Sequence, residues 1–149
     1  MNVLVMDGQG GGIGRALVEG LRQALPELDI TAVGTNAAAT SAMLKAGANQ
    51  AATGENAAVF NMRQADAILG PIGILVANGL MGEVTPRMAA GLGETLAVKI
   101  LIPVHKCRVE IAGLRDASVG QYIASAVEMV QNMARTEANA QGQKNGGNI

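Results

Sequence analysis

The sequence predicts a three-layer α/β fold, in which helices cover both faces of a parallel sheet. Short apolar runs such as residues 3–6 and 67–69 do not alternate with polar residues, which is typical of strands buried on both faces. Segments with helical periodicity separate these runs, and this alternation favours a parallel sheet. A chain of 149 residues is long enough for one domain with one core.

The expected elements follow one another in regular order. Pro26 ends the first helix, and Thr35 or Asn36 is placed to cap the second. Thr85 and Pro86 form a helix start. Strands are expected at residues 3–6, 29–33, 49–52, 67–69 and 99–104, and helices at 13–25, 37–46, 55–62, 86–92 and 119–135.

Three segments need separate predictions. Residues 72–77 fit either a helix start or a strand continuation, because short apolar runs cannot be assigned by period. Residues 108–112 alternate polar and apolar side chains, so we expect an antiparallel edge strand. Residues 136–149 are rich in Gly, Asn and Gln, so we expect a disordered tail after a single domain of residues 1–135.

The composition favours assembly. Apolar residues make up 49% of the chain and charged residues only 15%. So few charges would leave apolar surface exposed on a monomer, and we therefore expect a homo-oligomer, with a dimer as the simplest form.

The composition also argues against several partners. A net charge of −1 offers no footprint for nucleic acid or for an anionic membrane. Phe60 and Tyr122 are the two aromatic residues, so bases would find few stacking platforms. Cys107 is the single cysteine, which leaves no disulfide framework, and no signal peptide or bilayer-length apolar run is visible. We expect a cytoplasmic protein.

A glycine-rich turn follows the first expected strand and precedes the first helix. Its residues are Asp7, Gly8, Gln9, Gly10, Gly11, Gly12, Ile13 and Gly14. Glycines let the backbone approach a ligand without an intervening Cβ, and a helix N-terminus offers free N–H groups to an anion. We interpret the turn as a binding site for the phosphate of a nucleotide. Tight packing of strand against helix, without a ligand, is the alternative.

Two further turns belong at the same edge of the sheet, because ligands of such sheets bind beyond the carboxyl ends of the strands. Thr35 and Asn36 follow the second strand, and Gly70, Pro71 and Ile72 follow the fourth. We include these five residues in the predicted cofactor site. The cofactor stays open between NAD(P) and another nucleotide.

The spacing Gly8-x-x-x-Gly12-x-Gly14 resembles the cofactor turn of short-chain dehydrogenases. That resemblance implies a dinucleotide ligand. The chain departs from the family in lacking an acid after the second strand, and Tyr122 is followed four residues later by Ala126 rather than lysine. Hydride transfer by that family's mechanism is therefore not expected.

A second resemblance extends over most of the chain. Residues 7–14, 34–37, 39–48, 52–57 and 70–73, together with Ile102, Pro103 and Cys107, resemble a family of small bacterial proteins known as a conserved domain of unknown function. The resemblance implies a single Rossmann-like domain without an assigned activity.

His105 and Cys107 are two residues apart near the end of the fifth expected strand. In extended backbone both side chains would point the same way, and a histidine beside a cysteine can activate the thiol as a nucleophile. A lone cysteine is more often a small buried apolar residue. Two ligands do not complete a zinc site, so we expect no metal.

The carboxylates of Glu83, Glu94 and Glu110 show no pairing that indicates acid–base chemistry, and we expect them on the solvated surface. Three hypotheses for the function remain. The first is a small nucleotide- or dinucleotide-binding protein of unassigned activity. The second is a homo-oligomeric scaffold or regulatory protein without a nucleotide, and the third is a thiol-dependent enzyme that uses Cys107. Whether the chain is an enzyme stays open.

Overall fold

A five-stranded sheet organises the chain, with strand order β3-β2-β1-β4-β5. The computed structural model describes residues 1–104 and 108–145. Every strand pair is parallel, so the predicted parallel sheet is confirmed. The strands are β1 (Asn2–Asp7), β2 (Asp29–Gly34), β3 (Gln50–Thr53), β4 (Ala67–Pro71) and β5 (Val98–Ile102).

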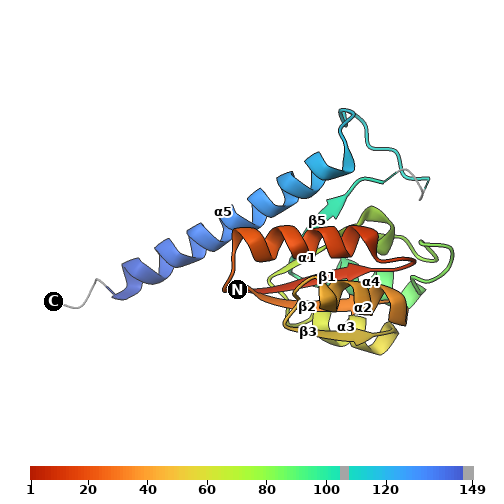
Figure 1. Cartoon of the computed structure of the whole chain (residues 1–149), viewed down its shortest axis with the longest axis horizontal. Helices are drawn as coiled ribbons and strands as arrows, with labels where there is room; N and C mark the ends of the chain where they lie inside the picture. The colour runs from red at the N-terminus through yellow and green to blue at the C-terminus, as the bar shows by residue number, and fades with distance from the viewer. Residues whose placement is uncertain (105–107, 146–149) are drawn as a thin grey trace.

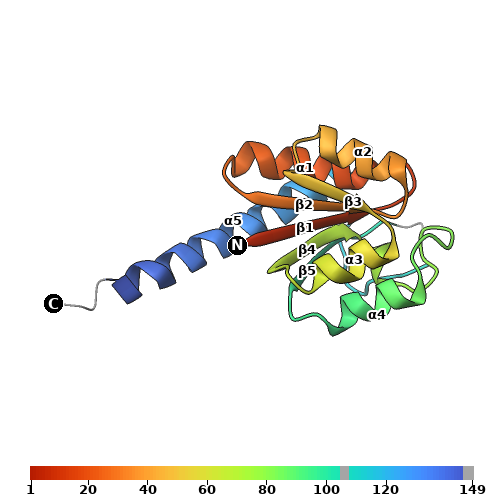
Figure 2. The same ribbon diagram turned by 90° about the horizontal axis from the view of Figure 1, so that it is seen from below.

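Helices cover both faces of the sheet, as Figure 2 shows. One face carries α1 (Gly12–Ala24), α2 (Ala37–Lys45) and α5 (Val119–Asn145). The other carries α3 (Glu55–Met62), α4 (Pro86–Glu94) and the short 3-10 helix η1 (Ile72–Leu75). Side chains of β1 alternate between the two cores: Val3 and Val5 pack on the first face, and Leu4 and Met6 on the second.

The predicted antiparallel edge strand at residues 108–112 is wrong, because the sheet of the described residues is wholly parallel. Arg108 has φ 51°, a left-handed conformation that an extended strand does not accommodate. Further on, the Leu114 N–H donates to the Ile111 carbonyl at 3.2 Å and closes a turn that contains Gly113 at φ 79°. The alternation of polar and apolar residues here therefore belongs to an irregular and largely exposed segment, not to a strand.

Helix α5 leans on α1 and β5 and then projects beyond the sheet (Figure 1). Ile123, Ala126, Val127 and Val130 are buried and form the face of α5 that packs on the body, whereas Val119 at its start is exposed. The helix continues past Arg135, where we expect it to end, through a segment that contains good helix formers such as Ala, Gln and Lys. The division into a domain of residues 1–135 and a tail stays a prediction.

The helix starts follow the sequence closely. Asn36 caps α2, its side-chain oxygen accepting the Ala39 N–H at 2.9 Å. Thr85 caps α4 in the same way through the Met88 N–H at 3.1 Å, with Pro86 as the first helical residue. Residues 72–75, ambiguous in the sequence, form the 3-10 helix η1 directly after β4.

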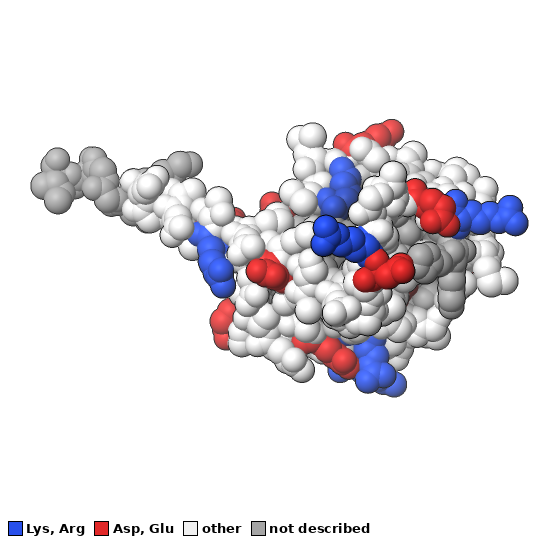
Figure 3. Space-filling view, turned by 90° about the horizontal axis from the view of Figure 1, so that it is seen from above, with Lys and Arg blue, Asp and Glu red and all other residues white. Residues whose placement is uncertain are grey.

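The surface is mixed in charge. Figure 3 shows Lys and Arg interspersed with Asp and Glu on one face of the molecule. None of the helices among the described residues combines the length and apolar character that crossing a membrane requires.

Arg22 connects three segments at the amino edge of the sheet. Its guanidinium donates to the carbonyls of Gly47, Pro26 and Leu28 and to Asn49 Oδ1, at distances from 2.6 to 3.0 Å. These bonds tie the end of α1 to the starts of β2 and β3. A planar guanidinium reaches several acceptors at once, which a lysine ammonium cannot do in the same geometry.

We predict that Arg22→Lys lowers the free energy of unfolding by about 1–3 kcal/mol, because hydrogen bonds to carbonyls are left unmade. Urea unfolding at neutral pH measures the change. The matched control is Arg15→Lys on the same helix, where the exposed arginine pairs with Glu19 at 2.8 Å, and we expect no measurable loss. Equal stability of the two variants would contradict this role of Arg22.

Candidate functional site at the carboxyl edge

The glycine-rich turn lies where β1 ends and α1 begins, next to the point where the strand order reverses. The chain moves from β1 to β2 and β3 on one side of the sheet, and to β4 and β5 on the other. Ligands of open parallel sheets bind at such a switch point. The turn is closed by the Gly11 N–H, which donates to the Gly8 carbonyl at 2.9 Å.

Asp7 caps α1 from beneath. Its carboxylate accepts the Gly8 N–H at 2.7 Å and the Gly14 N–H at 2.6 Å. The N-cap residue of α1 is Gly11, which has no side chain for this task. Asp7 is only 4% exposed. It therefore holds the turn against the helix as an N-cap side chain would, but from the preceding strand.

Burial makes the ionised form of the Asp7 carboxyl less favourable. Burial raises the pKa of the Asp7 carboxyl, the bonds from Gly14 and Gly8 lower it, and the neighbouring Glu83 carboxylate raises it. The net direction is upward. A carboxylate at this position would repel a ligand phosphate if it were exposed, but the buried Asp7 faces the backbone N–H groups beneath the turn.

Glu83 is a second carboxylate on the turn, and it comes from a distant part of the chain. Its Oε2 accepts the Gln9 N–H at 2.5 Å and the Thr35 hydroxyl at 2.9 Å. Its Oε1 accepts the Asn36 side-chain amide at 3.0 Å. The same amide also donates to the Gln9 carbonyl at 2.9 Å. Glu83 thus joins the end of β2 to the glycine turn.

The hydrogen bond from the Gln9 backbone N–H is the largest influence and lowers the pKa of the Glu83 carboxyl. Burial raises this pKa, and the bonds from Thr35 and Asn36 lower it further, so the net direction is downward. Glu83 is consequently ionised at neutral pH. Glu83 is partly exposed, as a surface acid is, but it also accepts three hydrogen bonds that the sequence does not predict. No local sequence signal identifies it, because its partners lie 47, 48 and 74 positions away along the chain.

The segment that carries Glu83, residues 76–85, is tightly wound. Asn78, Leu80 and Met81 have φ of 63°, 54° and 58°, in the left-handed region that side chains disfavour. Such residues cost about 1–3 kcal/mol each, and they gather at ligand clamps and switches. Val84 is fully buried beside Glu83 and pairs through its N–H with the Gly79 carbonyl at 3.1 Å. The loop therefore holds the carboxylate in a defined place.

Three glycines of the turn have structural reasons to be glycine. A Cβ on Gly8 would lie 2.5 Å from Glu83 Oε2, and one on Gly14 would lie 2.5 Å from the sulfur of Met43. Gly11 has φ 73° and approaches the Ala39 backbone closely. The packing of these three positions therefore needs no ligand to explain it.

Gly10 and Gly12 are different. A Cβ on either would meet nothing within 4 Å, and neither has a left-handed φ. Both are exposed, and neither N–H has a hydrogen-bond partner among the described residues. Gly12 is the first residue of α1, so its free N–H lies at the positive end of the helix. Neither packing against residues 1–104 and 108–145 nor backbone conformation explains these two glycines.

The structure brings most of the predicted site together. Thr35 and Asn36 lie against residues 7–14: the Thr35 N–H donates to the Asp7 carbonyl, and the Asn36 amide donates to the Gln9 carbonyl. Gly70 lies against β1, where a Cβ would be 2.3 Å from the Met6 carbonyl oxygen. Pro71 instead pairs with Ile102 of β5, and Ile72 lines a separate hollow of about 100 Å³ with Pro103 and Val104. Ile72 therefore faces the β5 side.

His105 and Cys107, the predicted thiol pair, lie outside the described residues. Within residues 1–104 and 108–145, no three His, Cys, Asp or Glu side chains gather as a metal site would require. Two larger hollows, of about 500 and 580 Å³, lie at the amino edge of the sheet beside Asp66 and Asp29, away from the glycine turn.

Comparison with known families places the chain. A family model described as a domain of unknown function (DUF3842) matches residues 2–135. The chain belongs to the DUF3842 family. The predicted resemblance to a family of unknown function is thereby confirmed, and the DUF3842 match includes the glycine turn, the Glu83 loop and most of α5.

A search of curated proteins found no match to this DUF3842 chain. Among solved structures, it is similar to a dodecameric FMN-dependent UbiX-like decarboxylase from Escherichia coli O157:H7. The identity is 19% and the TM-score 0.41, over 87% of this chain and 75% of the other. At this distance the likeness carries neither ligand nor activity to the DUF3842 chain.

We predict that Glu83→Gln destabilises the protein by about 1 kcal/mol at pH 7, because an amide cannot accept the Asn36 amide and the other two donors together. The folded-state pKa of Glu83 is below its ordinary value of 4.5, so its stabilisation is present above pH 4.5 and disappears as pH falls through the folded pKa. Urea unfolding from pH 7 to pH 3 measures the difference between wild type and variant.

The control is Glu94→Gln, an exposed acid at the end of α4. Its stability should follow wild type over the whole pH range. A Glu83→Gln difference that stays constant or grows toward pH 3 would show that the Glu83 charge does not hold the turn.

Proposed function

We propose that the chain binds a nucleotide, with a phosphate on the N–H groups of Gly10 and Gly12. One observation carries the proposal: the N–H groups of these two exposed glycines lie at the start of a helix without a partner among the described residues, and neither packing nor φ explains the glycines. A glycine without Cβ allows a phosphate oxygen to reach the backbone, and the helix dipole favours its charge. Catalysis is not part of the proposal.

The charge around the turn favours a pyrophosphate diester over a terminal phosphate. Asp7 and Glu83 are both close to the turn and both take N–H groups that an anion would otherwise use. A terminal phosphate carries a charge of about −1.5 to −2 at neutral pH. Each phosphorus of a dinucleotide pyrophosphate carries a single charge and is repelled less. We therefore favour a dinucleotide such as NAD(P) within the nucleotide class.

We predict that the double variant Gly10→Ala, Gly12→Ala keeps its thermal stability and loses at least tenfold in nucleotide affinity. The methyl groups enter open space in the free protein but stand between the backbone and the phosphate. Calorimetric titration with NAD⁺, NADP⁺, ADP and FMN measures binding, and a thermal melt measures stability.

The matched control is Gly93→Ala on α4, another glycine whose added Cβ meets nothing within 4 Å. It should bind like wild type. If no member of the panel binds wild type at millimolar concentration, or if the double variant binds as tightly as Gly93→Ala, the proposed site is refuted.

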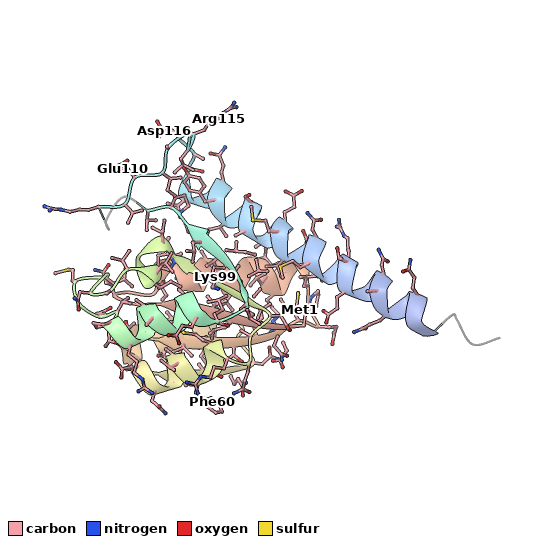
Figure 4. The ribbon with its side chains drawn as sticks, turned by 180° about the vertical axis from the view of Figure 1, so that it is seen from behind. Met1, Phe60, Lys99, Glu110, Arg115 and Asp116 are labelled. Carbon is pink, nitrogen blue, oxygen red and sulfur yellow. The ribbon has the colours of Figure 1, made fainter. Side chains whose placement is uncertain are left out.

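The second candidate function is assembly with another copy of the chain. Ile111, Leu114 and Met129 are between 41 and 51% exposed and line a groove of about 400 Å³ beside β5. Figure 4 shows the labelled Glu110, Arg115 and Asp116 pointing outward from the same segment between β5 and α5. A polar border around an apolar groove is typical of an interaction surface. A two-fold dimer would bury this groove against itself.

We predict a dimer for wild type and a dissociation constant at least tenfold higher for Met129→Glu, because a charge would be buried in the interface. Sedimentation velocity over a concentration series measures both. The control is Leu96→Glu, at a fully exposed leucine before β5 and away from the groove, which should leave the dimer intact. A monomeric wild type at 100 micromolar, a concentration at which a dimer of about 1 µM dissociation constant would be saturated, would end this proposal.

A further inference from the structure

Glu83 lies between the glycine turn and the residues that follow β2. Thr35 and Asn36 follow β2, and the Glu83 carboxylate bonds both of them and the Gln9 N–H. In dinucleotide-binding sheets, an acid at the end of the second strand accepts the ribose hydroxyl. This chain has Gly34, Thr35 and Asn36 there instead. The loop after η1 supplies the missing carboxylate from the other side of the sheet.

The hydrogen bonds of Glu83 leave room for one more donor. A carboxylate offers about four acceptor positions on its two oxygens. Oε2 uses two of them, for the Gln9 N–H and the Thr35 hydroxyl. Oε1 uses one, for the Asn36 amide. One acceptor position on Oε1 therefore has no donor among the described residues, and a hydroxyl is a donor that suits it.

The position of Glu83 is fixed on both sides. Val84, the next residue, is buried in the core, and the Gln9, Thr35 and Asn36 donors hold the carboxylate itself. This arrangement requires glycine at position 8, since a Cβ there would collide with Glu83 Oε2 and Thr35 Oγ1. A held carboxylate has a sharper preference than a mobile one, because it cannot withdraw from an unfavourable ligand.

We infer that Glu83 determines specificity: it accepts an unphosphorylated ribose diol and rejects a nucleotide with a phosphate on the ribose 2′-hydroxyl. The inference rests on the proposed nucleotide site and deepens it by naming the class of ligand. A 2′-phosphate would bring about two negative charges against an anchored carboxylate and would remove the hydroxyl donor. Ligands of the NAD class are therefore selected over those of the NADP class.

The test compares two probe pairs by calorimetric titration: NAD⁺ with NADP⁺, and AMP with adenosine 2′,5′-bisphosphate. Wild type should bind the unphosphorylated member of each pair at least tenfold tighter. Glu83→Gln removes the charge and keeps one oxygen, so the ratio should fall at least tenfold, mainly through tighter binding of the 2′-phosphorylated member. Glu94→Gln is the control and should keep the wild-type ratio.

Two results would overturn the inference while leaving the nucleotide site in place. One is equal or tighter binding of the 2′-phosphorylated members to wild type. The other is a Glu83→Gln variant that binds both members of a pair more tightly by the same factor. Glu83 would then repel any anion at the turn and would not distinguish the two ligands. If none of the four probes binds wild type, the proposed nucleotide site itself falls, and the inference about Glu83 falls with it.

Discussion

The hydrogen bonds between the Asp7 carboxylate and the backbone of the glycine turn are the interaction on which the carboxyl edge depends. They connect the end of β1 to the first residues of α1 through the Gly8 and Gly14 N–H groups. Gly14 can come this close only because it has no side chain, since a Cβ would lie 2.8 Å from Asp7 Cβ. The start of α1 is thereby fixed relative to the sheet, and the positions of Gly10 and Gly12 follow.

The carboxylates of Asp7 and Glu83 accept some of the backbone N–H groups of the turn, and the N–H groups on its outer side stay without a partner among the described residues. Asp7 takes N–H groups beneath the turn, and Glu83 takes the Gln9 N–H on the β2 side. Both charges are compensated by backbone donors, although burial still raises the pKa of Asp7. An anion can therefore use only the donors that remain on the outside. The N–H groups already bonded to Asp7 and Glu83 therefore limit the position of a phosphate more than the number of glycines in the turn does.

Local patterns predicted most of the fold because local physics decides it. The buried run at residues 3–6 and the helix start at Thr85–Pro86 each depend on a few residues and form as predicted, and of the two caps predicted for α2 the structure uses Asn36. Residues 108–112 show the limit, since a period of two is satisfied by irregular backbone as well as by a strand. Glu83 shows a deeper limit, because only the folded chain brings it to Gln9 and Thr35.

The glycine turn illustrates how requirements of the fold and of a ligand can be separated within one segment. Sequence alone treats its five glycines alike, as either packing residues or ligand contacts. The geometry assigns Gly8, Gly11 and Gly14 to packing and φ, and leaves Gly10 and Gly12 without such a reason. A fold that needed only a tight turn would accept alanine at both positions. Alanine would even stabilise such a fold, because it lowers the conformational entropy of the unfolded chain. The unexplained pair is therefore a sharper indicator of a binding surface than the glycine-rich spacing as a whole.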